Sequence, residues 1–132
     1  MTTTLRQAKL LKALGFNSPT AQFYRTEPGK EGKIHFSCGG PIDYNSNPYA
    51  ADKYPRISAP SVADALQWME EAKEIEWRID SLPVVGRIVS YFDKNRKKYF
   101  IGSLGSAHSS EQEPALLDEI LKHLTNSDCL TK

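Results

Sequence analysis

His35 and Cys38 form the first pair of residues in this chain whose types can do chemistry. A cysteine beside a histidine can act as an activated nucleophile, and both side chains bind metal ions. On a strand, however, positions three apart point to opposite faces, and His108 and His123 have no spacing that completes a ligand set. We therefore expect a strand end followed by a glycine turn, with no catalytic residue and no metal site. Chemistry at His35 and Cys38 is left open as the alternative.

Basic residues concentrate at 94–98, where Lys94, Arg96, Lys97 and Lys98 surround one asparagine. A basic hairpin tip can neutralise phosphates, so these four residues are candidate nucleic-acid contacts. The predicted final helix, by contrast, opens with two glutamates, which repel phosphate. A solvated hairpin tip is the favoured interpretation, and nucleic-acid contact is the alternative.

Four glutamates cluster around the end of one predicted helix: Glu70, Glu71, Glu74 and Glu76. Paired carboxylates can do acid and base work, but such a charge run usually forms a solvated side of a helix. The glycines and serines of 102–110 lack the glycine spacing and the lysine of a phosphate-binding loop. We therefore predict no cofactor.

The segment 38–56 is predicted to form a long loop that carries Tyr44, Tyr49 and Tyr54. Loops of this length inside a compact domain are usually functional or mobile. The tyrosines can line an interaction loop, or they can pin the segment to the core with buried rings and surface hydroxyls. Pinning is the favoured interpretation.

The stretch 58–80 is the best specified part of the chain. Ser61 and Asp64 have the spacing of a capping box, and Ser58 with Pro60 just inside the helix is an equally plausible start, so a helix begins near 59–62. Its apolar residues recur at three- and four-residue steps, and Trp68 borders the stripe that they form: Val62, Ala65, Leu66, Met69 and Ala72. From 75 to 80 apolar and charged residues alternate, which predicts a strand whose apolar face meets that stripe.

The remaining elements follow from similar signals. Thr4 and Gln7 predict a helix over 5–14 that ends at Gly15. Short strands are expected at 21–26 and 33–37, a hairpin from 84 onward, and a last helix that begins at a capping box of Ser110 and Glu113. The predicted fold class is α+β, with an antiparallel sheet packed against a central and a C-terminal helix, and with an N-terminal helix. Residues 1–132 are predicted to form a single domain, with 125–132 as a frayed tail.

Composition limits the classes of function. The chain has 132 residues, with 17 basic and 16 acidic side chains, and its net charge of +1 gives no global attraction to nucleic acid or membranes. Two cysteines are too few for a disulfide framework. No stretch has the length of a signal peptide core or a membrane span, so we expect a cytoplasmic protein.

Three features together resemble small uncharacterised proteins encoded by phages, prophages and mobile elements of Bacteroides-type gut bacteria. They are the LKxLGF helix at the N-terminus, the phrase ISAPSVADALQWMEE at a helix start, and a terminal helix after a hairpin. The matching positions in that phrase are Ser58, Ala59, Pro60, Ser61, Ala65 and Trp68. The resemblance implies an accessory bacterial or phage protein; it supplies no catalytic residues and does not cover the loop 38–56. The order helix, three strands, helix also resembles double-stranded-RNA-binding domains.

The predicted function is therefore a non-enzymatic accessory domain that binds another protein, whose identity the sequence does not give. A nucleic-acid-binding module that uses the hairpin tip 94–98 is the alternative.

Overall fold

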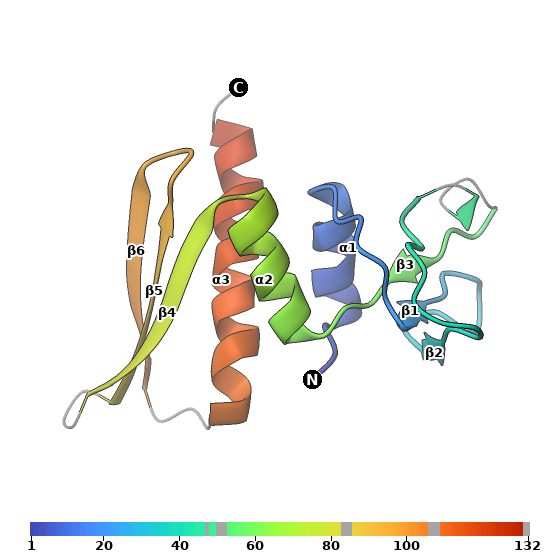
Figure 1. Cartoon of the computed structure of the whole chain (residues 1–132), viewed down its shortest axis with the longest axis horizontal. Helices are drawn as coiled ribbons and strands as arrows, with labels where there is room; N and C mark the ends of the chain where they lie inside the picture. The colour runs from blue at the N-terminus through green and yellow to red at the C-terminus, as the bar shows by residue number, and fades with distance from the viewer. Residues whose placement is uncertain (47, 50–52, 83–85, 106–108, 131–132) are drawn as a thin grey trace. The chain divides into compact units, whose positions relative to one another are not determined.

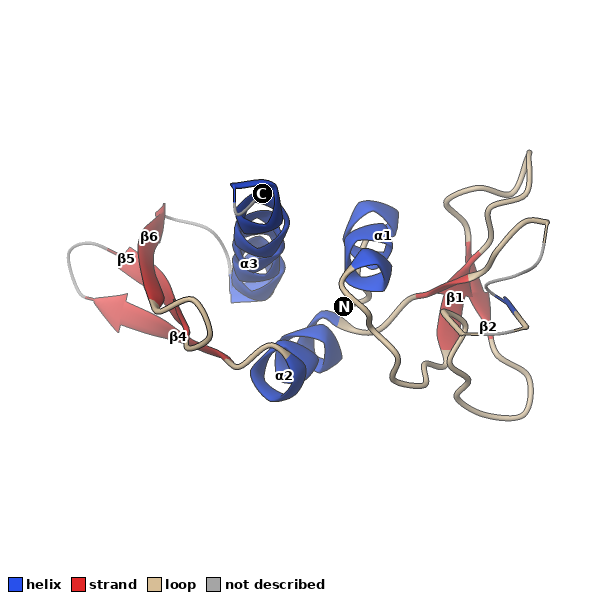
Figure 2. Ribbon diagram, turned by 90° about the horizontal axis from the view of Figure 1, so that it is seen from above, coloured by secondary structure: helices blue, strands red, loops and turns tan. Residues whose placement is uncertain are grey.

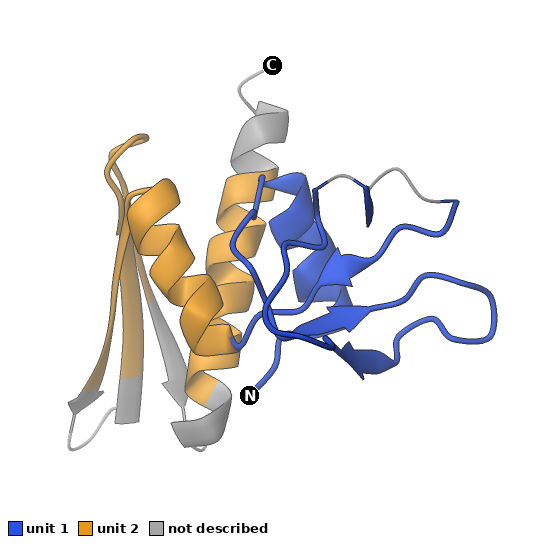
Figure 3. Ribbon diagram, turned by 45° about the vertical axis from the view of Figure 1, so that its right-hand side comes forward, with its two compact units in different colours: residues 1–61 blue, residues 62–132 orange. Residues whose placement is uncertain are grey.

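The computed structural model describes residues 1–46, 48–49, 53–82, 86–105 and 109–130. The chain divides into two compact units, residues 1–61 and 62–132 (Figure 3). Each unit contains a three-stranded antiparallel sheet and at least one helix, which confirms the α+β class but gives two small sheets where one was predicted. A single domain over 1–132 stays a prediction, and one cooperative unfolding transition is its signature.

Helix α1 (Leu5–Ala13) is closed at both ends by the residues that predicted it. The Thr4 hydroxyl accepts a hydrogen bond from the Gln7 backbone N–H, and the Gln7 side chain accepts one from the Thr4 N–H. Gly15 has a φ of 97°, and the N–H groups of Gly15 and Phe16 donate to the carbonyls of Lys12 and Leu11. This is a Schellman ending, and it places the ring of Phe16 in the core, 2% exposed.

The sheet of the first unit has the order β2-β1-β3, with β1 (Gln22–Tyr24) between β2 (Ile34–Phe36) and β3 (Ile57–Ser58). The strands β1 and β2 were predicted, whereas β3 was not, since its two residues read as the approach to a helix. Tyr24 is buried against Ala8 of α1 and Ile57 of β3. The Tyr24 hydroxyl also donates to the Thr3 carbonyl at 2.5 Å, which ties the start of the chain to this sheet.

The second unit consists of α2 (Val62–Ala72), β4 (Ile75–Leu82), β5 (Gly86–Asp93), β6 (Lys98–Gly105) and α3 (Ser109–Leu130). The strands pair in the order β4-β5-β6, and both helices lie on the same side of the sheet (Figures 1 and 2). The predicted succession of helix, three strands and helix is thus confirmed. The residues 83–85 at the expected start of the hairpin, and the Ser110 side chain of the expected capping box, lie outside the part that the structure describes.

The helix stripes account for the core of this unit. In α2 the predicted apolar residues are buried except Ala72, which is exposed, while Trp68 is buried at 8% exposed. The buried face of α2 therefore includes Trp68 and excludes Ala72, because burial of a large ring gains more free energy than burial of an alanine side chain. In α3 the buried apolar side chains among the described residues are Leu116, Leu117, Ile120, Leu121 and Leu124. This helix continues to Leu130, so the helical backbone extends past the predicted end near 124.

Candidate functional site

The hairpin tip between β5 and β6 is organised by Asp93, whose side chain is fully buried. Its carboxylate accepts hydrogen bonds from the backbone N–H groups of Asn95 and Arg96, at 3.0 and 3.1 Å, and from Nη1 of Arg96 at 3.1 Å. Nε2 of His123 in α3 lies 3.0 Å from the same carboxylate. An ionised carboxylate only accepts, so Nε2 carries the proton in this contact.

This arrangement shifts the pKa values of Asp93 and Tyr91. Burial raises the pKa of the Asp93 carboxyl, but the hydrogen bonds from His123 and Arg96 and the charge of Arg96 outweigh it, so the pKa lies below the ordinary value. Burial, followed by the charges of Glu119 and Asp93, raises the pKa of Tyr91 to about 12. Tyr91 packs between Phe100 and His123, with ring centroids 5.0 and 5.4 Å away. Both groups belong to the packing of the unit and not to an exposed site.

The tip also contacts the short connection between α2 and β4. The backbone N–H of Lys94 donates to the Glu74 carbonyl at 3.2 Å, and the Asn95 side chain donates to the Lys73 carbonyl at 3.4 Å. Lys73 and Glu74 lie between the end of α2 and the start of β4. The tip is therefore tied to this connection as well as to α3.

The four predicted nucleic-acid contacts differ in what surrounds them. Lys94 forms an ion pair with Glu76 at 2.9 Å, and Arg96 forms one with the buried Asp93 at 3.1 Å. Lys97 and Lys98 are exposed to solvent. Two of the four cations are thus neutralised by the protein itself, which leaves a smaller positive patch than the sequence predicts.

The three tyrosines of the predicted interaction loop differ in how far their side chains are exposed to solvent. Tyr44 is buried, with its ring centroid 4.4 Å from that of Phe23, and its N–H donates to Ser58 Oγ at 3.0 Å. Tyr49 is half-buried beside Tyr44, at 5.1 Å between ring centroids, whereas Tyr54 is 42% exposed. The ring contacts of Tyr44 and Tyr49 hold this loop against the core, as the favoured interpretation predicts. Of the three tyrosines, Tyr54 has the most exposed side chain.

His35 and Cys38 are not brought together as a reactive pair. Cys38 is an exposed free thiol after β2, while His35 stacks on Phe23 with ring centroids 5.5 Å apart. Burial, followed by four surrounding positive charges, lowers the pKa of His35. Among the residues that the structure describes, no three histidine, cysteine or acidic side chains gather as metal ligands.

Within the same described residues, no helix is long and apolar enough to cross a membrane.

The outer face of the β4-β5-β6 sheet, opposite α2 and α3, carries exposed apolar side chains. Phe92 pairs across the strands with Tyr99, and Ser90 pairs with Ile101. Tyr99 and Ile101 are each 63% exposed, whereas the alternate residue Phe100 turns inward and stacks on Tyr91. We call Phe92, Tyr99 and Ile101 the outer apolar face.

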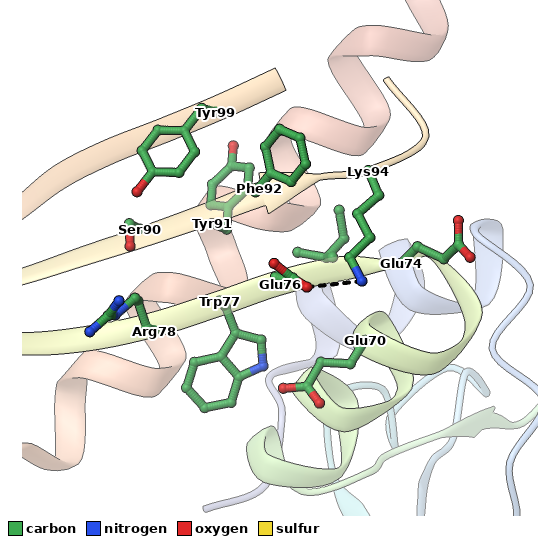
Figure 4. A pocket seen from close by; sticks show the side chains of 11 residues that line it. Glu70, Glu74, Glu76, Trp77, Arg78, Ser90, Tyr91, Phe92, Lys94 and Tyr99 are labelled. Carbon is green, nitrogen blue, oxygen red and sulfur yellow. Dashed lines mark ion pairs between the residues drawn. The ribbon is translucent and has the colours of Figure 1, made fainter. Parts of the chain in front are cut away.

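A hollow of about 590 Å³ adjoins this face at β4. Its lining combines Phe92 and Tyr99 with Trp77 and Arg78 of β4, with Glu70 of α2, and with Glu74 between α2 and β4 (Figure 4). Trp77 and Ile75 were predicted to face α2, and Ile75 is buried there. The Trp77 indole nitrogen is shielded from solvent and has no hydrogen-bond partner among the described residues.

The sequence interpretation did not single out Tyr99, Ile101 or Trp77 as site residues. A signal was present, since Tyr99, Phe100 and Ile101 are three successive apolar residues in a strand. A strand with one buried face alternates, so an unbroken apolar run in β6 indicates a second apolar face that the unit itself does not cover.

Comparison of the chain with protein-family models, with curated proteins and with solved structures finds no match in any of the three. The resemblance to phage and mobile-element proteins therefore stays an expectation from the sequence.

Proposed function

We propose that this protein is a non-enzymatic interaction domain that binds another protein through the outer apolar face of its second unit. The observation that supports this proposal is the exposure of Tyr99 and Ile101, 63% each, side by side with Phe92 on one sheet face. Single exposed apolar residues are common, but a contiguous group beside a hollow is typical of binding surfaces. Aromatic residues are also enriched at the centres of protein interfaces.

The proposal is tested by selecting peptides from a displayed random library on the immobilised full chain. Binders are then measured against Tyr99→Ser and Ile101→Thr. We expect both variants to weaken binding at least fivefold, since each removes exposed apolar contact area without a buried cavity. Phe36→Ser is the matched control, because Phe36 is 71% exposed but lies in the first unit.

Selected peptides that bind Tyr99→Ser and wild type equally would contradict the proposal. Sedimentation of the wild type at increasing concentration completes the test. Self-association that Tyr99→Ser abolishes would identify the partner as a second copy of this chain.

A further inference from the structure

We infer that the open edge of β2 binds an extended segment of a partner protein in which apolar and acidic residues alternate. The segment adds a further strand to the sheet of the first unit, beside Ile34 and Phe36. This inference is independent of the proposed function, which concerns the second unit. It gives the protein another interaction surface and the chemistry of the segment that binds there.

The first argument is the direction of the backbone groups of β2. The Ser37 N–H donates to the Ala21 carbonyl at 2.7 Å, which continues the register of β1 with β2 by one pair. Because hydrogen-bonded and non-hydrogen-bonded pairs alternate along an antiparallel ladder, the N–H and C=O groups of Ile34 and Phe36 point away from β1. β2 is the last strand in the order β2-β1-β3, and no described residue forms a hydrogen bond with these backbone groups.

The second argument is that the side chains on this edge are apolar and exposed. Ile34 is 41% exposed and Phe36 is 71% exposed. Both lie on the face of the sheet that carries Tyr24, since Tyr24 pairs with Ile34 and side chains alternate along a strand. An edge strand with unpaired backbone groups and exposed apolar side chains is a template for the addition of another strand.

The third argument is the positive charge on the opposite face of the same strand, where His35 lies. Burial lowers the pKa of His35, and the charges of four cations lower it further: Arg25, Lys30, Lys33 and Arg56. Arg25 forms an ion pair with Glu27, whereas the other three form none among the described residues. The first unit holds eight basic and four acidic side chains, and the second holds nine and twelve. An acidic residue is therefore complementary to this face.

A peptide strand fits both faces and the backbone of β2 together. Side chains alternate along an added strand, so those beside Ile34 and Phe36 are apolar, and those beside His35 and Lys33 are acidic. The backbone of the peptide supplies the carbonyls and N–H groups that pair with the open edge. A nucleic acid supplies negative charge but no backbone ladder with the spacing of a strand.

The experiment uses the full chain and a fluorescently labelled synthetic peptide that alternates valine with glutamate, with anisotropy as the readout. In an added strand, the N–H groups of one alternate set of residues bond to β2, and those of the other set face solvent. Peptides N-methylated at all valines or at all glutamates should therefore differ in affinity by about tenfold or more. Loss with the valine set indicates an antiparallel strand, and loss with the glutamate set indicates a parallel one. A peptide with lysine in place of glutamate should bind about tenfold more weakly or worse.

Variants of the chain locate the site. Phe36→Ser removes exposed apolar area and should weaken binding about fivefold or more, and Lys33→Glu should weaken it about tenfold or more. Lys53→Glu is the matched control, because it makes the same change of charge in the same unit and Lys53 is not among the cations that act on His35. In the library selection, peptides that add to β2 are recognised because Phe36→Ser weakens them and Tyr99→Ser does not.

Four results would overturn the inference. They are no binding of the valine–glutamate peptide, equal affinity for its lysine counterpart, and equal affinity of the two N-methylated peptides, which indicates a surface contact without strand addition. The fourth is self-association of the wild type, measured by sedimentation, that Phe36→Ser abolishes, because the occupant of the edge is then a second copy of this chain. None of these results bears on Tyr99, so the proposed function would stand.

Discussion

Replacement of Asp93 offers the sharpest test of how the second unit is held together. Its buried carboxylate accepts from two backbone N–H groups, from Arg96 and from His123. Asp93→Asn keeps the shape and one acceptor oxygen for the two backbone N–H groups, but it replaces the oxygen that accepts from Arg96 and His123 with an NH2 donor, so both of those bonds are lost. Since a hydrogen bond to a charged group is worth about 1.5 kcal/mol or more, we expect a loss of about 3 kcal/mol. Asp93→Ala removes every acceptor and should cost about 3–5 kcal/mol.

Urea unfolding followed by tryptophan fluorescence measures these losses, because Trp68 and Trp77 both lie in the second unit. Asp80→Asn is the matched control: it also removes an aspartate paired with an arginine, but its side chain is 41% exposed. Its effect should stay within about 0.5 kcal/mol. An Asp93→Asn variant as stable as Asp80→Asn would refute the reasoning.

The difference in unfolding free energy between wild type and Asp93→Asn should depend on pH. Because the pKa of Asp93 is lowered by folding, its stabilisation is present above the ordinary pKa of about 3.9 and is lost as the pH falls through the folded value. The stability difference between wild type and Asp93→Asn should therefore shrink in acid. A difference that stays constant down to about pH 2 would contradict the lowered pKa.

Three further predictions concern single groups. Tyr91 should ionise near pH 12, so the stability that its neutral form provides should disappear between about pH 10 and 12; tyrosinate absorbance of wild type and Tyr91→Phe checks this. Lys97 has a φ of 55°, so Lys97→Gly should stabilise the unit by about 0.5–1 kcal/mol in urea unfolding, whereas Lys98→Gly in β6 should destabilise it. Nucleic-acid binding should be weak in an anisotropy titration, because Lys94 and Arg96 are ion-paired. Strong salt-sensitive binding that is lost in the double variant Lys97→Ala and Lys98→Ala would favour the alternative function.

Local signals predicted the elements well because they act over a few residues. The capping box of Thr4 and Gln7 and the glycine that ends α1 specify both boundaries of that helix without help from the rest of the chain. The alternation at 75–80 likewise predicted β4. The strand β3 was missed because two residues are too short for any periodicity, and its pairing with β1 depends on residues more than thirty positions away.

The candidate site was harder to predict, since it depends on which charges meet. The run at 94–98 reads as a positive patch, but Glu76 and Asp93 come from β4 and the end of β5 to neutralise part of it. The acidic residues were predicted to be solvated, and Glu70, Glu71, Glu74 and Glu76 are indeed exposed, although Glu76 also pairs with Lys94. These ion pairs are not visible before the strand register is known.

The position of β6 at the edge of its sheet also bears on how the protein behaves at high concentration. Its outer backbone groups have no neighbouring strand among the described residues, and its exposed Tyr99 and Ile101 favour pairing with another such edge. Lys97 and Lys98 stand at the start of this strand, where their charges repel a second copy that approaches in the same way. The charges of Lys97 and Lys98 therefore oppose pairing of this edge with a second copy, while the exposed Tyr99 and Ile101 favour it.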